Sequence, residues 1–183
     1  MRTLNEQLST YALYHRDRRN IATHFVGVPM IVFGVFAFAS RPALLVGGIT
    51  LSPALLVLLG GTVFYLLMDR RFGLAMLAAI TPPFAAGMWL ATQGTGVWLG
   101  VAAGLFGVGW VIQFIGHIFE GKKPAFVDDL VGLLIGPLFV MAETAFMLGM
   151  RREVQEVIEA KAGPTHGGKR AGAGEASLQN TTA

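Results

Sequence analysis

Four side chains of the kind that bind transition metals lie near the ends of two long apolar segments. They are His15, His24, His117 and Glu120. The chain contains no cysteine, which excludes thiolate ligands, cysteine-held iron–sulfur clusters and cysteine nucleophiles. Three imidazoles and a carboxylate suit a non-haem Fe(II) site and, less specifically, a zinc or manganese site. Such a site could activate oxygen or, if it held zinc, support hydrolysis.

The spacing of these residues indicates which of them share a helix face. Gln113, His117 and Glu120 are separated by four and three residues, so they lie on one face of a helix. His15 and His24 would be about half a turn out of phase on one continuous helix. They can therefore converge only if the chain breaks between them.

The elements that must position these side chains are membrane helices. Hydrophobic residues make up 54% of the chain and charged residues 14%, with a mean hydropathy of +0.59, whereas soluble domains carry roughly 25% charged residues. Long apolar runs between charged clusters predict an all-α polytopic bundle of about four to five spans, preceded by an amphipathic helix over residues 4–18. The spans are expected at residues 21–39, 52–68, 72–92, 97–119 and 126–150.

Smaller signals define the ends of these elements. Asn20 is the expected N-cap of the first span and supplies the break between the two histidines. Gly136-Pro137 interrupts the last segment, so this segment could be broken or re-entrant. One membrane domain is expected over residues 1–155, followed by a flexible low-complexity tail over 156–183.

The distribution of Lys and Arg predicts the orientation. With alternating spans, one side of the membrane holds Arg2, Arg16, Arg18, Arg19, Arg70, Arg71, Lys122 and Lys123. The positive-inside rule makes this side cytoplasmic, and the four candidate ligands lie on it. The Ala- and Gly-rich composition is compatible with a bacterial inner membrane protein. A net charge of +3, spread beside apolar runs, argues against nucleic-acid binding.

Less specific interpretations stay open for several of these residues. An interfacial histidine often contacts lipid headgroups or packs through a hydrogen bond, and a polar cluster kept for packing would suit a lipid-binding or scaffold protein. A small transporter fits less well, because the polar residues gather at one face and do not line a path across the membrane. Glu143 is expected in helix packing or in a separate polar pocket, and His166 in the tail.

Three stretches together resemble the membrane 2-hydroxy fatty acid dioxygenase family: YALYHRDRRNIATHFVGVP, WVIQFIGHIFEGKKPAF and GPLFVMAE. The resemblance covers roughly residues 5–150. It implies an Fe(II)-dependent enzyme that shortens long-chain 2-hydroxy fatty acids by one carbon through α-oxidation. The partners that it implies are molecular oxygen, the fatty acid and membrane lipids, without a 2-oxoglutarate co-substrate.

Specific roles follow from this resemblance. We expect Fe(II) to be bound by the three histidines, with Glu120 as a further ligand or as a group that orients them. Hydrogen bonds to the imidazoles are expected from Asn20 and Gln113. The substrate carboxylate is expected to meet Arg19, Lys122 or Lys123, and the acyl chain to lie between helices.

Overall fold

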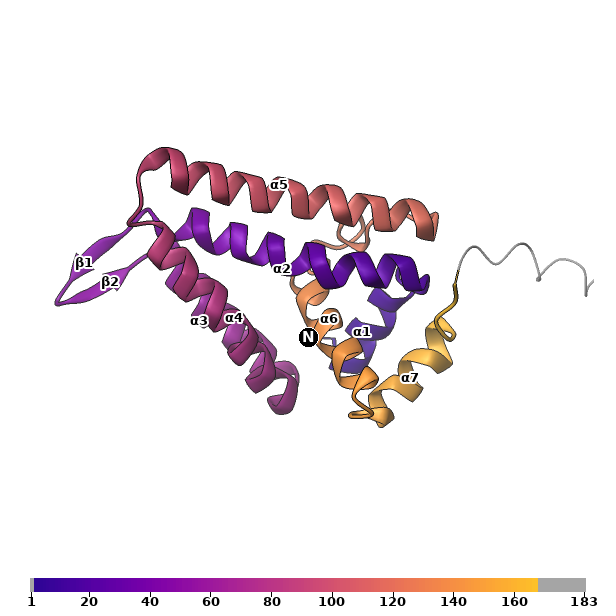
Figure 1. Ribbon diagram of the computed structural model, residues 1–183. Helices are drawn as coiled ribbons and strands as arrows, with labels where there is room; N and C mark the ends of the chain where they lie inside the picture. Colours follow the sequence, from indigo (N-terminus) through magenta and orange to yellow (C-terminus); the bar gives the residue numbers. More distant parts are fainter. Residues whose placement is uncertain (1, 168–183) are drawn as a thin grey trace, which may run out of the picture.

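Seven α-helices make up most of the computed structural model, which describes residues 2–167 (Figure 1). They are α1 (Leu4–Ala12), α2 (Arg18–Ser40), α3 (Pro53–Met68), α4 (Arg70–Leu90), α5 (Thr95–Glu120), α6 (Gly132–Met147) and α7 (Arg152–Ala162). A hairpin of β1 (Leu44–Val46) and β2 (Ile49–Leu51) joins α2 to α3, and the short 3-10 helix η1 (Ala125–Val127) precedes α6. The predicted all-α class is confirmed.

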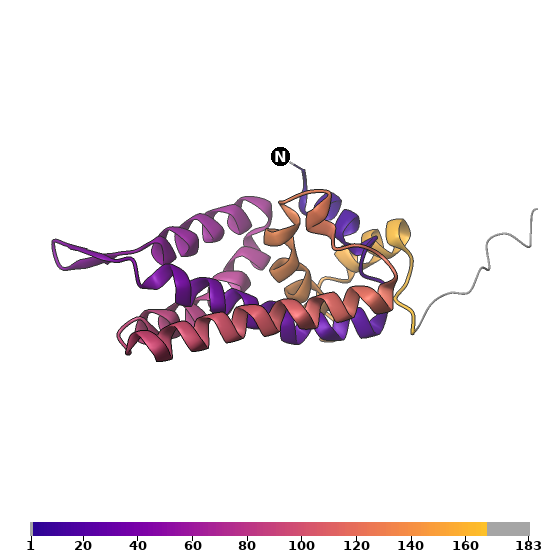
Figure 2. The same cartoon turned by 90° about the horizontal axis from the view of Figure 1, so that it is seen from above.

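The long helices α2 and α5 lie side by side and antiparallel, and they form the spine of the bundle (Figures 1 and 2). Glycines allow their backbones to approach closely. A Cβ atom at Gly27 would lie 2.8 Å from the carbonyl oxygen of Gly109, and one at Gly109 would lie 2.9 Å from the carbonyl oxygen of Gly27. Small residues at such a crossing are typical of helix pairs in membranes.

Three helices, α2, α4 and α5, are long and apolar enough to cross a membrane. The apolar helix α3 has 16 residues, which is about 24 Å at 1.5 Å per residue and shorter than a hydrocarbon core of about 30 Å. Helices α6 and α7 qualify as a span only when joined, and the chain bends by 114° between them. The described residues therefore provide three candidate spans, which is fewer than expected, or four with the bent pair, which is the lower end of the expected number.

Two helix pairs and a central helix create the space for a site. Helices α3 and α4 pack on each other and diverge from the α2–α5 pair, while α6 stands in the opening between the pairs (Figure 1). Helices α1 and α7 pack together beside α6, near the start of α2 and the end of α5. The polar side chains from both ends of the chain are thus brought to one end of the bundle.

The bend between α6 and α7 returns the chain to α1. Arg151 has a left-handed backbone with φ of 56°, and its guanidinium binds the Asp69 carboxylate at 2.9 and 3.0 Å. Ile158 of α7 is buried in the main hydrophobic core. The expected domain boundary at residue 155 falls inside α7, because this amphipathic helix continues the fold. Residues 168–183 of the expected tail lie outside the described residues.

Candidate metal centre and adjoining cavity

The three histidines expected as ligands converge in the structure. Ring centroids lie 4.5 Å apart for His15 and His24, 4.9 Å for His15 and His117, and 5.4 Å for His24 and His117. The ring planes cross at 71° to 80°. One nitrogen from each ring lies within 4.8 Å of the other two, and all three residues are buried. Three imidazole nitrogens directed at one region form a donor set that suits iron or zinc.

The chain breaks between His15 and His24, as their convergence requires. Helix α1 ends at Ala12 and α2 begins at Arg18, so residues 13–17 form a short connection. The N-cap is Asp17, whose carboxylate accepts the N–H of Arg19, and not Asn20, which lies inside α2. Aspartate caps helices as well as asparagine does, and this one precedes the expected position by three residues.

Main-chain carbonyls orient two of the rings. Nδ1 of His15 lies 2.8 Å from the carbonyl oxygen of Tyr11, and Nδ1 of His24 lies 2.8 Å from that of Asn20. A carbonyl can only accept, so each Nδ1 carries the proton and each Nε2 is left as a lone-pair donor for a metal. The Tyr11 ring also stacks on His15 at 4.1 Å with an interplanar angle of 3°.

Two ring nitrogens of this histidine cluster are buried without a hydrogen-bond partner in the described part of the chain. They are Nε2 of His15 and Nδ1 of His117. Leaving a buried polar atom unsatisfied costs about 1–3 kcal/mol, and a bound metal ion would satisfy both. The residues present therefore fit a metal ion held by three neutral imidazoles.

The burial of His15 makes the stability of the folded protein depend on pH. Desolvation lowers the pKa of His15 well below its ordinary value, and the neighbouring His24 adds to this effect. Below about pH 6.5 the unfolded chain therefore binds more protons than the folded one, so stability falls as the pH falls. We expect both the thermal midpoint and the metal content to decrease on acidification from about pH 7 to 5. Thermal unfolding and metal analysis across this range would test it, and a flat profile would contradict a buried neutral His15.

The group of side chains that converge closely enough to hold a metal ion consists of the three histidines and does not include Glu120. Its carboxylate accepts the backbone N–H of Arg16 at 3.0 and 3.1 Å and that of Asp17 at 2.8 Å. It also accepts the Nδ2–H of Asn20 at 3.1 Å. Of its two expected roles, these contacts fit the orienting one, because they fix the connection that carries His15.

A pair of substitutions separates these two roles of Glu120. Glu120→Ala leaves two backbone N–H groups without their acceptor, so we expect metal affinity to fall by about 10–100-fold, as for other groups that support a ligand. Glu120→Gln keeps one acceptor oxygen and should retain most of the affinity. Metal titration of the purified variants measures both. If Glu120→Gln abolished binding altogether, the carboxylate would be a ligand.

The segment that follows α7 holds the connection between α1 and α2 from another side. The N–H of Arg18 donates to the carbonyl of His166, and the N–H of His166 donates to the carbonyl of Arg16, both at 2.8 Å. His166, which the sequence places in a flexible tail, therefore forms a short parallel bridge with residues 16–18. The loop that presents His15 is clamped between α5 and the segment after α7.

The two amide residues expected to bind the imidazoles do not use their side chains in that way. The Nδ2 of Asn20 donates to Glu120 and to the carbonyl of Tyr14, so Asn20 orients His24 only through its main chain. Both amide atoms of Gln113 are buried and have no hydrogen-bond partner among the described residues. The expected hydrogen bond from Gln113 to an imidazole is therefore absent.

The basic residues expected to meet a substrate carboxylate are engaged elsewhere. Arg19 binds Asp17 at 2.8 Å, the Nζ of Lys122 donates to the carbonyl of Leu13 at 2.6 Å, and Lys123 pairs with Asp128. None of the three lines the cavity described below. The structure thus brings the histidines together but leaves these cations at the surface.

Sequence reasoning missed one buried ion pair beside the site. Arg16, expected to mark the membrane surface, has only 5% of its area exposed and binds Glu143 of α6 at 3.2 Å. Its Nε donates to the carbonyls of Ala12 and His15. Glu143, expected in helix packing or in a separate polar pocket, thus pairs with Arg16, and nothing local in the sequence identifies this partner.

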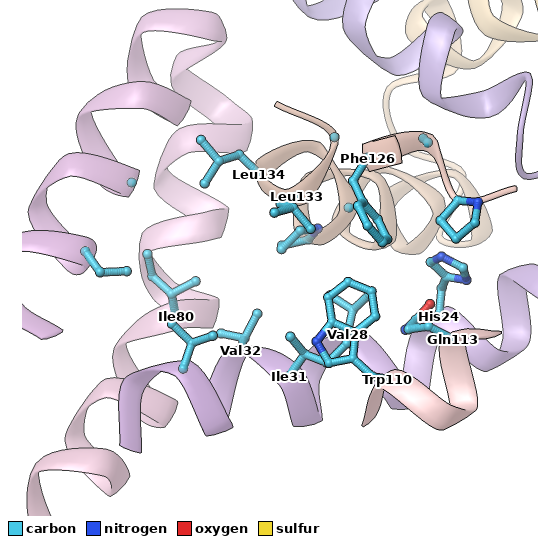
Figure 3. A pocket seen from close by; sticks show the side chains of 18 of the residues that line it. His24, Val28, Ile31, Val32, Ile80, Trp110, Gln113, Phe126, Leu133 and Leu134 are labelled. Atoms are coloured by element: carbon cyan, nitrogen blue, oxygen red, sulfur yellow. The ribbon is translucent and has the colours of Figure 1, made fainter. Parts of the chain in front are cut away.

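A cavity of about 500 Å³ adjoins the imidazoles. Figure 3 shows His24 and Gln113 at one end of it and the apolar side chains of Ile80 and Leu134 at the other. Its lining comes from α1 to α6 and the residues before α6, and includes no Asp, Glu, Lys or Arg. The volume lies within the range of about 300–1,000 Å³ typical of small-molecule sites. Such a cavity suits a long apolar chain whose head group lies at the histidines.

Comparison of the sequence with known proteins identifies the family of this chain. Residues 1–148 match the family model described as 2-hydroxy-palmitic acid dioxygenase Mpo1-like. The chain is 32% identical over 158 residues to the 2-hydroxy-palmitic acid dioxygenase MPO1 of Saccharomyces cerevisiae. The matched region covers 85% of this chain and 87% of the yeast protein. No solved structure matches. Because the family model matches residues 1–148, which is most of the chain, this chain belongs to the Mpo1-like family.

Proposed function

We propose that this protein is an Fe(II)-dependent dioxygenase that carries out α-oxidation of long-chain 2-hydroxy fatty acids to products one carbon shorter. The observation that carries the proposal is the junction of three buried imidazoles with an apolar cavity of about 500 Å³. The names of the family and of the yeast relative both specify 2-hydroxy-palmitic acid and a dioxygenase. Three nitrogen donors also leave positions open for oxygen and substrate, as non-haem iron oxygenases require.

The chain's own residues supply binding, orientation and exclusion of water. His15, His24 and His117 would hold the ion, and bound Fe(II) supplies the activation of oxygen. The carbonyls of Tyr11 and Asn20 keep the Nδ1 protons of two rings in place, which fixes their orientation. The apolar lining excludes water from the acyl chain and places the substrate's carboxyl end, rather than its middle, beside the imidazoles. Reaction is thereby confined to the carbon next to the carboxylate.

The orientation in the membrane belongs to the same proposal. The chain is a membrane protein with candidate spans α2, α4 and α5. Arg18 and Arg70 begin two of these spans and Lys122 follows the third, so the positive-inside rule favours a cytoplasmic site and, for a bacterial chain, the inner membrane. The fatty acid would enter from the surrounding lipid.

The absence of cysteine makes this orientation testable. In a cysteine-free background, Thr92→Cys should react with a membrane-impermeant maleimide added outside intact cells. Arg70→Cys should react only after the membrane is disrupted, because it lies at the opposite end of α4 and is exposed there. The reverse labelling pattern would place the histidines on the outer face.

The direct test of function is anaerobic purification in detergent, loading with Fe(II), and oxygen uptake with 2-hydroxypalmitate against palmitate. We expect uptake that requires both Fe(II) and the 2-hydroxyl, together with a product one carbon shorter by mass spectrometry. A folded protein that binds no iron and consumes no oxygen would favour a lipid-binding or scaffold protein. Zinc binding without oxygen uptake would favour a hydrolytic site.

A further inference from the structure

The amide of Gln113 occupies an unusual position at the polar end of the cavity. Gln113 is 5% exposed, lines the cavity, and lies one turn before His117 on α5. Its side chain packs against Gly27 of α2, where an added Cβ atom would lie 2.5 Å from Nε2. The close approach of α2 and α5 therefore holds the amide in place beside His24 (Figure 3).

Neither amide atom of Gln113 has a hydrogen-bond partner among residues 2–167. A buried amide without partners destabilises a protein, and an apolar side chain of the same size would remove this penalty. Buried polar groups that stay unpaired in a native structure call for an explanation such as a bound molecule. Because Gln113 faces a cavity, a ligand can supply the missing donor and acceptor.

The chemistry of that ligand follows from the other groups in the cavity. The lining includes no Lys or Arg, and Arg19, Lys122 and Lys123 have their own partners. The protein therefore recognises the head group through neutral groups. A glutamine amide presents a donor, Nε2–H, beside an acceptor, Oε1. A 2-hydroxy acid presents the complementary pair on adjacent carbons, because its carboxylate accepts and its hydroxyl donates.

We propose that Gln113 binds the head group of the substrate and selects 2-hydroxy acids over unsubstituted acids. Nε2–H donates to the carboxylate, and Oε1 accepts the hydrogen of the 2-hydroxyl. An acid that lacks the hydroxyl leaves Oε1 buried and unpaired, which is the kind of loss that gives strong discrimination. The identity of the acid rests on the proposed function, but the selection itself requires neither iron nor oxygen.

Binding to the metal-free protein tests this selection, because it removes chelation of iron by the hydroxyl. Trp110 lines the cavity, so tryptophan fluorescence in detergent can report titration with 2-hydroxypalmitate and with palmitate. Partition of the acids into detergent affects every variant alike and cancels when preferences are compared. We expect the unmodified protein to prefer the 2-hydroxy acid by about tenfold, the size of one buried hydrogen bond. Gln113→Met should reduce this preference to about twofold or less. It should also weaken palmitate binding, because the carboxylate of either acid loses the Nε2–H donor.

A matched control and a second ligand keep the result interpretable. Gln93→Met makes the same change in the turn before α5, where the amide binds Trp89 and Thr92, and should keep the full preference. Gln113→Met should unfold at no lower temperature than the unmodified protein, since it removes an unpaired buried amide. 2-Methoxypalmitate, which lacks the donor hydrogen, should bind the unmodified protein as weakly as palmitate.

The two proposals fail in different ways. A preference that survives in Gln113→Met, or that is missing from the metal-free unmodified protein, overturns the role of Gln113 whether or not oxygen is consumed. Selective binding that depends on Gln113, without Fe(II)-dependent oxygen uptake, would leave a 2-hydroxy acid binding protein and overturn only the dioxygenase.

Discussion

Replacing His117 with alanine should remove bound iron and reduce oxygen uptake by about 100-fold or more, because loss of a ligand exceeds the 10–100-fold cost of losing its support. The Nδ1 atom of His117 has no hydrogen-bond partner in the described structure, so the substitution breaks no hydrogen bond made by that atom. We therefore expect the helical content to be retained. Iron analysis, oxygen uptake and circular dichroism on the same preparation measure the three effects.

The chain offers a matched control for this substitution. His166 lies outside the imidazole cluster and contributes its backbone to the bridge with Arg16 and Arg18, which alanine also provides. His166→Ala should keep the iron content of the unmodified protein. Near-normal iron and turnover in His117→Ala would show that His117 is not a ligand.

Breaking the ion pair between Arg16 and Glu143 should give the largest loss of stability. The two side chains are only 6% and 13% exposed, and removing one partner of a buried pair costs about 3–5 kcal/mol. Arg16→Met leaves Glu143 without its cation and also removes the hydrogen bonds to the carbonyls of Ala12, His15 and Gly163. Thermal unfolding in detergent should show a midpoint many degrees lower, together with reduced metal affinity because the His15 carbonyl loses its contact with Arg16.

Two further variants test whether the pair itself is responsible. Arg2→Ala removes an exposed pair with Asp129 and should change the midpoint little, as surface pairs contribute little. Replacing both partners, Arg16→Met with Glu143→Leu, should recover part of the loss, because no uncompensated charge remains buried. A double variant as unstable as the sum of the two single variants would assign the effect to packing instead.

Local patterns in the sequence were sufficient to predict those parts of the site that depend on a single helix. Hydropathy identified α2 and α5, and the four-residue spacing of Gln113 and His117 placed both on the face of α5 that lines the cavity. The need for a break between His15 and His24 was also correct, although Asp17 rather than Asn20 caps the helix. Spacing and capping act within a few residues, so a single sequence carries them.

Contacts between segments that are distant in the sequence could not be predicted from such local patterns. Arg16 has two other arginines within three positions, and its contact with Glu143, 127 residues away, distinguishes it as buried. Lys122 is expected at a substrate carboxylate but reaches the carbonyl of Leu13. Gln113 was assigned to an imidazole because both lie on one face, whereas the exact direction of its amide depends on packing against Gly27.

The clamped connection at residues 13–17 has a consequence for how the protein is made. His15 and His24 are synthesised early, but His117 follows more than half the chain later, and the partners Glu120, Glu143 and His166 come after it. Such long-range contacts form only once the intervening chain is available. A nascent chain with α1 and α2 alone holds two imidazoles and an untethered loop. Under the proposed function, iron loading would follow membrane insertion, and depleting iron during synthesis should yield an inserted protein that can still be activated afterwards.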